Sequence, residues 1–236
     1  MLFSSDEVAG YINDNFEPAW ESVRPVPMVT IDFGNGHKIT RTLNGNVATH
    51  ACTADGTVLD ILPGVYTADS YRRQLGQFVL LHRYTLSAAP GRIGARLKDY
   101  HERQAGLLAR NQAPATFVER TAGASILGVE KSVQLIAGGR PNRGVARVAI
   151  AAAPAPAAEQ LAGWKELAED TRINETVRRL AIHKKLAELG SAKPTDITKW
   201  LYKDVLHADL DDPYLGLKDI LDKQYPFASE DAAKPK

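Results

Sequence analysis

The 236-residue sequence has little cysteine and no excess of either charge. Its one cysteine, Cys52, excludes an intramolecular disulfide framework and any zinc site built from several cysteines. Lysine and arginine number 29 and aspartate and glutamate 28, which leaves a net charge of +1. This balance gives no global attraction to nucleic acid or to an anionic membrane, so we expect the chain to bind neither.

Long apolar runs are also missing. No stretch approaches the roughly 18 consecutive apolar residues that a membrane-spanning helix needs. The first residues, Met1 to Glu7, have neither the basic start nor the apolar segment of a signal peptide. A single cysteine is compatible with a reducing compartment. The sequence therefore predicts cytoplasmic localisation.

Three short turns divide the first third of the chain: Asn35-Gly36, Asn44-Gly45 and Asp55-Gly56. Asn-Gly and Asp-Gly between apolar runs favour hairpins, because a type I′ turn needs positive φ at both central residues. The pattern predicts a small antiparallel meander over residues 27–62. Apolar residues at helical spacing follow in many places, so the predicted fold class is α+β.

The composition and periodicity of the sequence predict several domains and connecting segments. Residues 1–85 read as one α+β domain, and 86–150 as a helix with an irregular connecting region. Alanine and proline dominate residues 151–158, which we interpret as a linker. Residues 159–228 show helical periodicity and predict a helical domain. The charged tail, 229–236, has no core residues and is predicted to be disordered.

The first 85 residues resemble the second half of a thioredoxin-like domain in the order of their elements. The segments that carry the resemblance are Val8–Phe16, Val29–Phe33, Val47–Gly56, Val58–Leu62 with Gly64, and Tyr71–Leu75. The chain departs from the family because it has no Cys-x-x-Cys motif. In the family that motif precedes the helix that begins here at Ser4, so it would lie before Met1. The chain is then either a degenerate relative or one with a truncated start.

The resemblance implies a redox-inactive thioredoxin-like module that binds a protein partner or a small ligand, because the dithiol of the family chemistry is missing. An alternative is an enzyme that uses a single cysteine. His50 and Cys52 are two apart on a predicted strand and share a face, and an imidazolium would lower the thiol pKa.

Such a pair would give a thiol oxidoreductase, a peroxidase or a hydrolase nucleophile. Same-face neighbours on a strand are, however, roughly 6.5–7 Å apart at Cα, which is far for a thiol–imidazole bond. The competing interpretation is a small, buried and unreactive Cys52.

A third function is metal-dependent chemistry. His207, Asp209 and Asp211 form the densest group of possible ligands, and oxygen donors with an imidazole suit Mg²⁺, Mn²⁺ or Fe²⁺. The competing interpretation is structural: Asp212 caps a helix that Pro213 opens. Apart from this possible divalent metal, the sequence predicts no cofactor.

Overall fold

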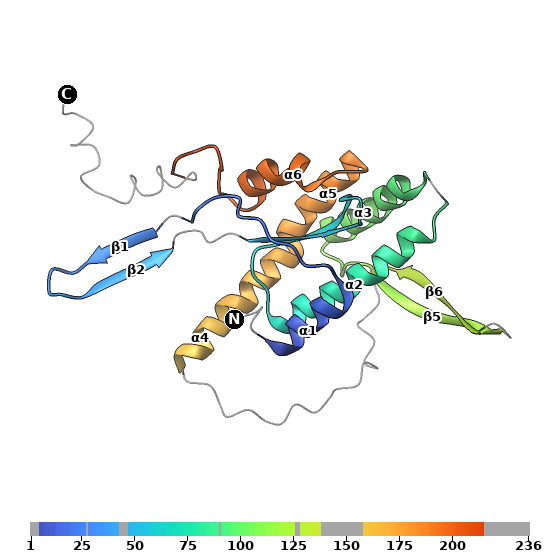
Figure 1. Ribbon diagram of the computed structural model, residues 1–236, viewed down its shortest axis with the longest axis horizontal. Helices are drawn as coiled ribbons and strands as arrows, with labels where there is room; N and C mark the ends of the chain where they lie inside the picture. The colour runs from blue at the N-terminus through green and yellow to red at the C-terminus, as the bar shows by residue number, and fades with distance from the viewer. Residues whose placement is uncertain are drawn as a thin grey trace. The chain divides into compact units, whose positions relative to one another are not determined.

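A computed structural model shows mixed α and β structure, with several helices and three antiparallel hairpins (Figure 1). The structure describes residues 5–26, 28–42, 47–89, 91–125, 128–137 and 158–214. The chain divides into two compact units, Met1–Pro18 with Ala48–Pro194 and Ala19–Val47 with Thr195–Lys236. Among the described residues, no helix has the length and apolar character needed to span a membrane.

The first unit contains most of the elements. Its helices are α1 (Asp6–Asn15), α2 (Ala68–Leu86), α3 (Ile93–Ala109), α4 (Ala158–Ile173), the π-helix η2 (Asn174–Arg178) and α5 (Arg179–Leu189), and its strands are β3 (Ala48–Cys52), β4 (Val58–Pro63), β5 (Thr116–Ser125) and β6 (Gly128–Ile136). Helix α3 packs against α5, and both α2 and α5 contact β4. Strand β4 therefore lies at the centre of this unit.

Strands β3 and β4 form an antiparallel hairpin around the predicted Asp55-Gly56 turn. Gly56 has a φ of +84°, and the Thr57 hydroxyl donates to the Asp55 carboxylate at 2.9 Å. Every residue of β4 is buried, as its apolar sequence predicts. At the far end, Gly64 with a φ of +74° turns the chain toward α2.

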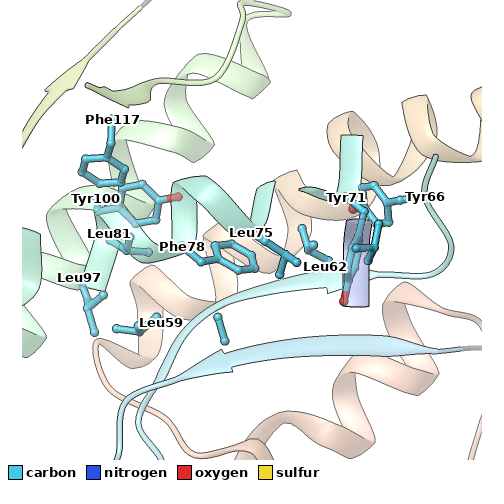
Figure 2. Packing of buried hydrophobic residues seen from close by; sticks show 12 residues of the cluster. Leu59, Leu62, Tyr66, Tyr71, Leu75, Phe78, Leu81, Leu97, Tyr100 and Phe117 are labelled. Atoms are coloured by element: carbon cyan, nitrogen blue, oxygen red, sulfur yellow. The ribbon is translucent and has the colours of Figure 1, made fainter. Parts of the chain in front are cut away.

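The main core lies between β4 and the helices that cover it. Figure 2 shows its members Leu59, Leu62, Tyr66, Tyr71, Leu75, Phe78, Leu81, Leu97, Tyr100 and Phe117. The helical spacing of Tyr71, Leu75 and Phe78 predicts a buried stripe on α2, and the structure confirms it. This stripe packs α2 against β4.

In the second unit, β1 (Met28–Asp32) and β2 (Lys38–Thr42) form their own hairpin. The helices here are α6 (Pro194–Trp200), whose first residue closes the first unit, and the π-helix η3 (Leu201–Val205). Within the part of the chain that the structure describes, no ladder joins β2 to β3. The predicted meander is instead two separate hairpins, and its central turn at Gly45 lies outside the described residues.

A third hairpin, β5–β6, falls where the sequence predicts an irregular connection. Its pairing runs from Thr116 opposite Ile136 to Ser125 opposite Gly128. The Gln77 amide on α2 anchors it: its oxygen accepts from the Phe117 backbone N–H at 2.6 Å, and its nitrogen donates to the Phe117 carbonyl at 3.4 Å. The predicted linker at 151–158, apart from Ala158, and the predicted tail at 229–236 lie outside the described residues.

Candidate functional site

A group of buried polar side chains meets where β4, α3 and α5 come together. Asp60 projects from β4, Tyr100 and His101 come from α3, and Arg179 and His183 come from α5. All five side chains are buried. Because buried polar groups are unfavourable unless they are paired, their joint burial requires a connected network. We call these five residues the buried polar cluster.

Asp60 is the centre of this network. Its Oδ2 accepts hydrogen bonds from the Tyr100 hydroxyl, at 3.0 Å, and from the Arg179 guanidinium. Its Oδ1 accepts from the Ile61 backbone N–H at 2.8 Å. Burial by itself would raise the pKa of Asp60, but the charge of Arg179 outweighs it and lowers this pKa. The carboxylate is therefore ionised at neutral pH.

The two histidines contact each other directly. The Nδ1 atoms of His101 and His183 are 2.9 Å apart, so one of them must carry a hydrogen that the other accepts. Burial lowers the pKa of His101 to about 4 and that of His183 well below its ordinary value. Both rings are neutral at pH 7. The Nδ1 of His183 also lies 4.0 Å from Asp60 Oδ1.

The chain places α5 against β4 through the π-helical segment η2. Asn174 is fully buried there, and its amide donates to the Val65 carbonyl at 2.7 Å. A Cβ at Gly64 would lie 2.9 Å from Asn174 Nδ2, so only glycine allows this close approach. Arg179 and His183 follow four residues apart on one helix face, which directs both toward Asp60.

His50 and Cys52 occupy β3, but a β-bulge between Ala51 and Cys52 interrupts the pairing. The bulge brings Cys52 opposite Val58, at the end of the ladder next to the turn. Cys52 is exposed, so the prediction of a buried cysteine is wrong. Within the described residues, no hydrogen bond joins Cys52 to His50. Surrounding protein atoms, and then the negative charge of Asp55, raise the pKa of the Cys52 thiol.

Cys52 should therefore react slowly despite its exposure. A raised pKa leaves less thiolate at pH 7, and the thiolate is the nucleophile. We expect iodoacetamide to modify native Cys52 more slowly than the same cysteine in urea, with a pH profile displaced toward higher pH in the native protein. Mass spectrometry over time measures both rates. Faster labelling of the native protein would contradict the assignment and favour an enzyme that uses Cys52.

The predicted metal ligands lie in the second unit, and lysines already pair with two of them. Asp209 lies 2.7 Å from the Lys203 ammonium, and Asp211 lies 2.9 Å from that of Lys199. His207 is exposed and has a φ of +54°. The capping contact of Asp212 is present, since its carboxylate accepts from the Tyr214 backbone N–H at 2.9 Å. The rest of the helix predicted to follow lies outside the described residues.

The buried polar cluster escapes motif analysis because its members are far apart in sequence. His101 and His183 are 82 positions apart in the sequence, and Asp60 comes 40 positions before Tyr100. One local signal could have found it. Asp60 is the single charged residue in the otherwise apolar strand Val58–Leu62, and a charge there needs a buried partner. No family model, curated protein or solved structure matches this chain, so the functional argument depends on its own residues.

Proposed function

We propose that the chain is a redox-inactive, thioredoxin-like binding module that engages a protein partner. The observation that carries this proposal is an exposed apolar face on the β1–β2 hairpin. We call it the hairpin face, and it consists of Val29, Ile31, Phe33 and Ile39. The side chains of this set are 36%, 48%, 56% and 41% exposed, in that order.

The hairpin is amphipathic. Ile31 lies directly opposite Ile39 in the pairing. The other side is mostly polar: the Thr30 and Thr40 hydroxyls are 3.1 Å apart, Lys38 pairs with Asp32 at 2.8 Å, and only Met28 at its end is apolar. Strand residues alternate between faces, so Val29, Ile31 and Ile39 gather on one side, with Arg41 opposite Val29 in the register. Apolar groups clustered on a surface are typical of sites that bind other proteins.

The hairpin has only two strands and an uncovered apolar side, and both features favour a polypeptide as the partner. A two-stranded hairpin is marginally stable by itself and gains stability from a third strand or a packed apolar surface. An extended, apolar segment of a partner supplies both, by pairing with a strand edge and covering the hairpin face. A small ligand would instead need a concave site.

One surface depression is present in the first unit, but it suits a small ligand poorly. It measures about 370 Å³, and its lining includes Tyr84, Arg92 and Arg96. The Arg96 guanidinium donates to the Tyr84 carbonyl and the Ser87 hydroxyl, both at 2.6 Å, and lies over the Tyr84 ring. The Arg96 guanidinium, which would be the natural group to bind a ligand here, is therefore already engaged in contacts within the chain.

The helix packing and the cysteine content support the redox-inactive, thioredoxin-like part of the proposal. Helix α1 packs against α2, and the β3–β4 hairpin precedes α2, as the resemblance implies, whereas the segment Val29–Phe33 lies in the separate β1–β2 hairpin of the second unit. The chain has one cysteine, so it cannot cycle between a dithiol and an intramolecular disulfide. Cys52 also has a raised pKa and no hydrogen-bonded base within the described residues.

The test compares two lysine substitutions on opposite sides of the hairpin. Ile31→Lys places a charge in the hairpin face, and Thr30→Lys places the same charge on the polar side. Quantitative affinity purification from cells of the source organism, with thermal melts of each variant, compares them with wild type. We expect Ile31→Lys to reduce recovery of the partner at least about tenfold, since truncating a central apolar anchor typically costs about 2 kcal/mol.

Thr30→Lys should retain the partner, and both variants should melt close to wild type because the substituted positions are exposed. Equal recovery with the two variants would overturn the proposal, because the binding would then not depend on the apolar side.

A further inference from the structure

Three members of the buried polar cluster offer metal ligands in one place. The oxygen and nitrogen ligand atoms of Asp60, His101 and His183 all lie within 4.8 Å of one another, and all three residues are buried. We propose that these three residues bind one divalent transition-metal ion, with Zn²⁺ as the favoured occupant. The site is separate from the hairpin face and from the binding role proposed for it.

The spacing of the donor atoms suits such an ion. The two Nδ1 atoms are 2.9 Å apart, and Asp60 Oδ1 lies 4.0 Å from His183 Nδ1. In a tetrahedral zinc site with bonds of about 2.0–2.2 Å, ligand atoms are about 3.3–3.5 Å apart. These two separations lie about 0.4 and 0.5 Å outside that range, and the third pair of ligand atoms lies within 4.8 Å. Small rotations of the three side chains would bring the donors to tetrahedral spacing.

A bound ion requires neutral imidazoles and an ionised carboxylate. Binding through both Nδ1 atoms places the remaining hydrogen of each ring on Nε2, so the net protonation of the pair does not change. A ring bound through Nδ1 carries its hydrogen on Nε2 and usually donates it to a nearby acceptor.

The carboxylate is held in place for this role. Arg179 and Tyr100 both bind Oδ2 of Asp60, which leaves a lone pair of Oδ1 directed to the histidines. Outer contacts of this kind orient ligating carboxylates in metal sites.

An ion in this position would join β4, α3 and α5. These elements meet only through tertiary packing, so the metal would act as an internal cross-link of the first unit. The burial of all three ligands gives a substrate no path to the ion, so we assign it a structural role. The donor set, two imidazoles and one carboxylate, favours Zn²⁺ over Mg²⁺ or Ca²⁺, which prefer oxygen ligands.

The test uses the full chain after its metal has been removed with a chelator. Calorimetric titration with Zn²⁺ should show one ion per chain, and melts should show a higher midpoint with Zn²⁺ than with EDTA. With a water molecule as the fourth ligand, Co²⁺ should give the intense visible absorption of a four-coordinate ion. His183→Gln should weaken Zn²⁺ binding by more than about 100-fold, since even outer-contact substitutions weaken metal affinity 10–100-fold.

Two further histidine variants serve as matched controls. His50→Gln changes a half-buried histidine of β3, and His207→Gln changes the histidine of the sequence-predicted metal group. Both should bind Zn²⁺ like wild type. Loss of binding in His207→Gln with binding kept in His183→Gln would overturn the proposal and place the metal in the second unit. Two results on the wild-type protein alone would also overturn the proposal: no stoichiometric Zn²⁺ binding, or a Co²⁺ spectrum typical of a six-coordinate ion. Neither result depends on whether His183→Gln folds.

Discussion

Arg179→Met is expected to lower the free energy of unfolding by about 3–5 kcal/mol, because it leaves the Asp60 carboxylate buried without its charged partner. The guanidinium also donates to the Gln74 amide oxygen at 2.7 Å, and that acceptor loses its partner as well. Methionine keeps much of the side-chain volume, so a cavity is not the main cause of the loss. Urea unfolding in the presence of EDTA measures this effect without compensation by a metal ion.

The matched control is Arg83→Met. Arg83 pairs with Glu119 at 2.9 Å, but both side chains are partly exposed. An exposed ion pair contributes about 0–1 kcal/mol, so this variant should unfold nearly like wild type. If Arg179→Met were no more destabilising than Arg83→Met, Asp60 would not depend on Arg179, and the description of the buried polar cluster would be wrong.

Phe78→Ala should have an effect of similar size for a different reason. Phe78 is buried at the centre of the α2 stripe, and the Arg179 guanidinium lies 6.0 Å from the centre of its ring. Removing a buried phenyl ring costs about 3–5 kcal/mol through lost burial and the remaining cavity. The ring also forms part of the wall of the buried polar cluster, so the cavity would open beside a buried ion pair.

Chemical unfolding again supplies the measurement, and Leu86→Ala on the same helix is the control. Leu86 is 60% exposed at the last turn of α2, and its truncation should change stability by less than about 0.5 kcal/mol. Comparable losses in the two variants would contradict the assignment of Phe78 to the core.

Elements with a strong local pattern could be predicted from the sequence. The Asp55-Gly56 turn, the apolar run of β4 and the stripe of α2 each combine turn chemistry or periodicity with burial. The β5–β6 hairpin lacks such a signal. Its strands mix apolar residues with charged ones such as Glu119 and Lys131, which form an ion pair with each other across the ladder. Its position depends on the Gln77 side chain, a tertiary contact that local periodicity cannot indicate.

The buried polar cluster depends on tertiary contacts even more strongly. Neither His101 nor His183 stands in a ligand motif, and each looks like a single histidine on a helix. Only the packing of α3 against α5 brings the two rings together. The error at Cys52 arises because a free cysteine is usually buried, and that tendency guided the prediction. In β3 the neighbouring Ala51 takes the buried face, and alternation leaves Cys52 on the exposed one.

The long sequence separation between Asp60 and Arg179 affects how the first unit folds during synthesis. Asp60 and Arg179 are 119 residues apart in the chain. Synthesis at about 5–20 residues per second separates their emergence by about 6–24 s. During that interval β4 and α2 are already available, while the positive charge that neutralises Asp60 has not been synthesised. Until α5 has been synthesised, β4 of the nascent first unit therefore stays uncovered on its α5 side. Binding of a chaperone during this period would protect the chain from aggregation.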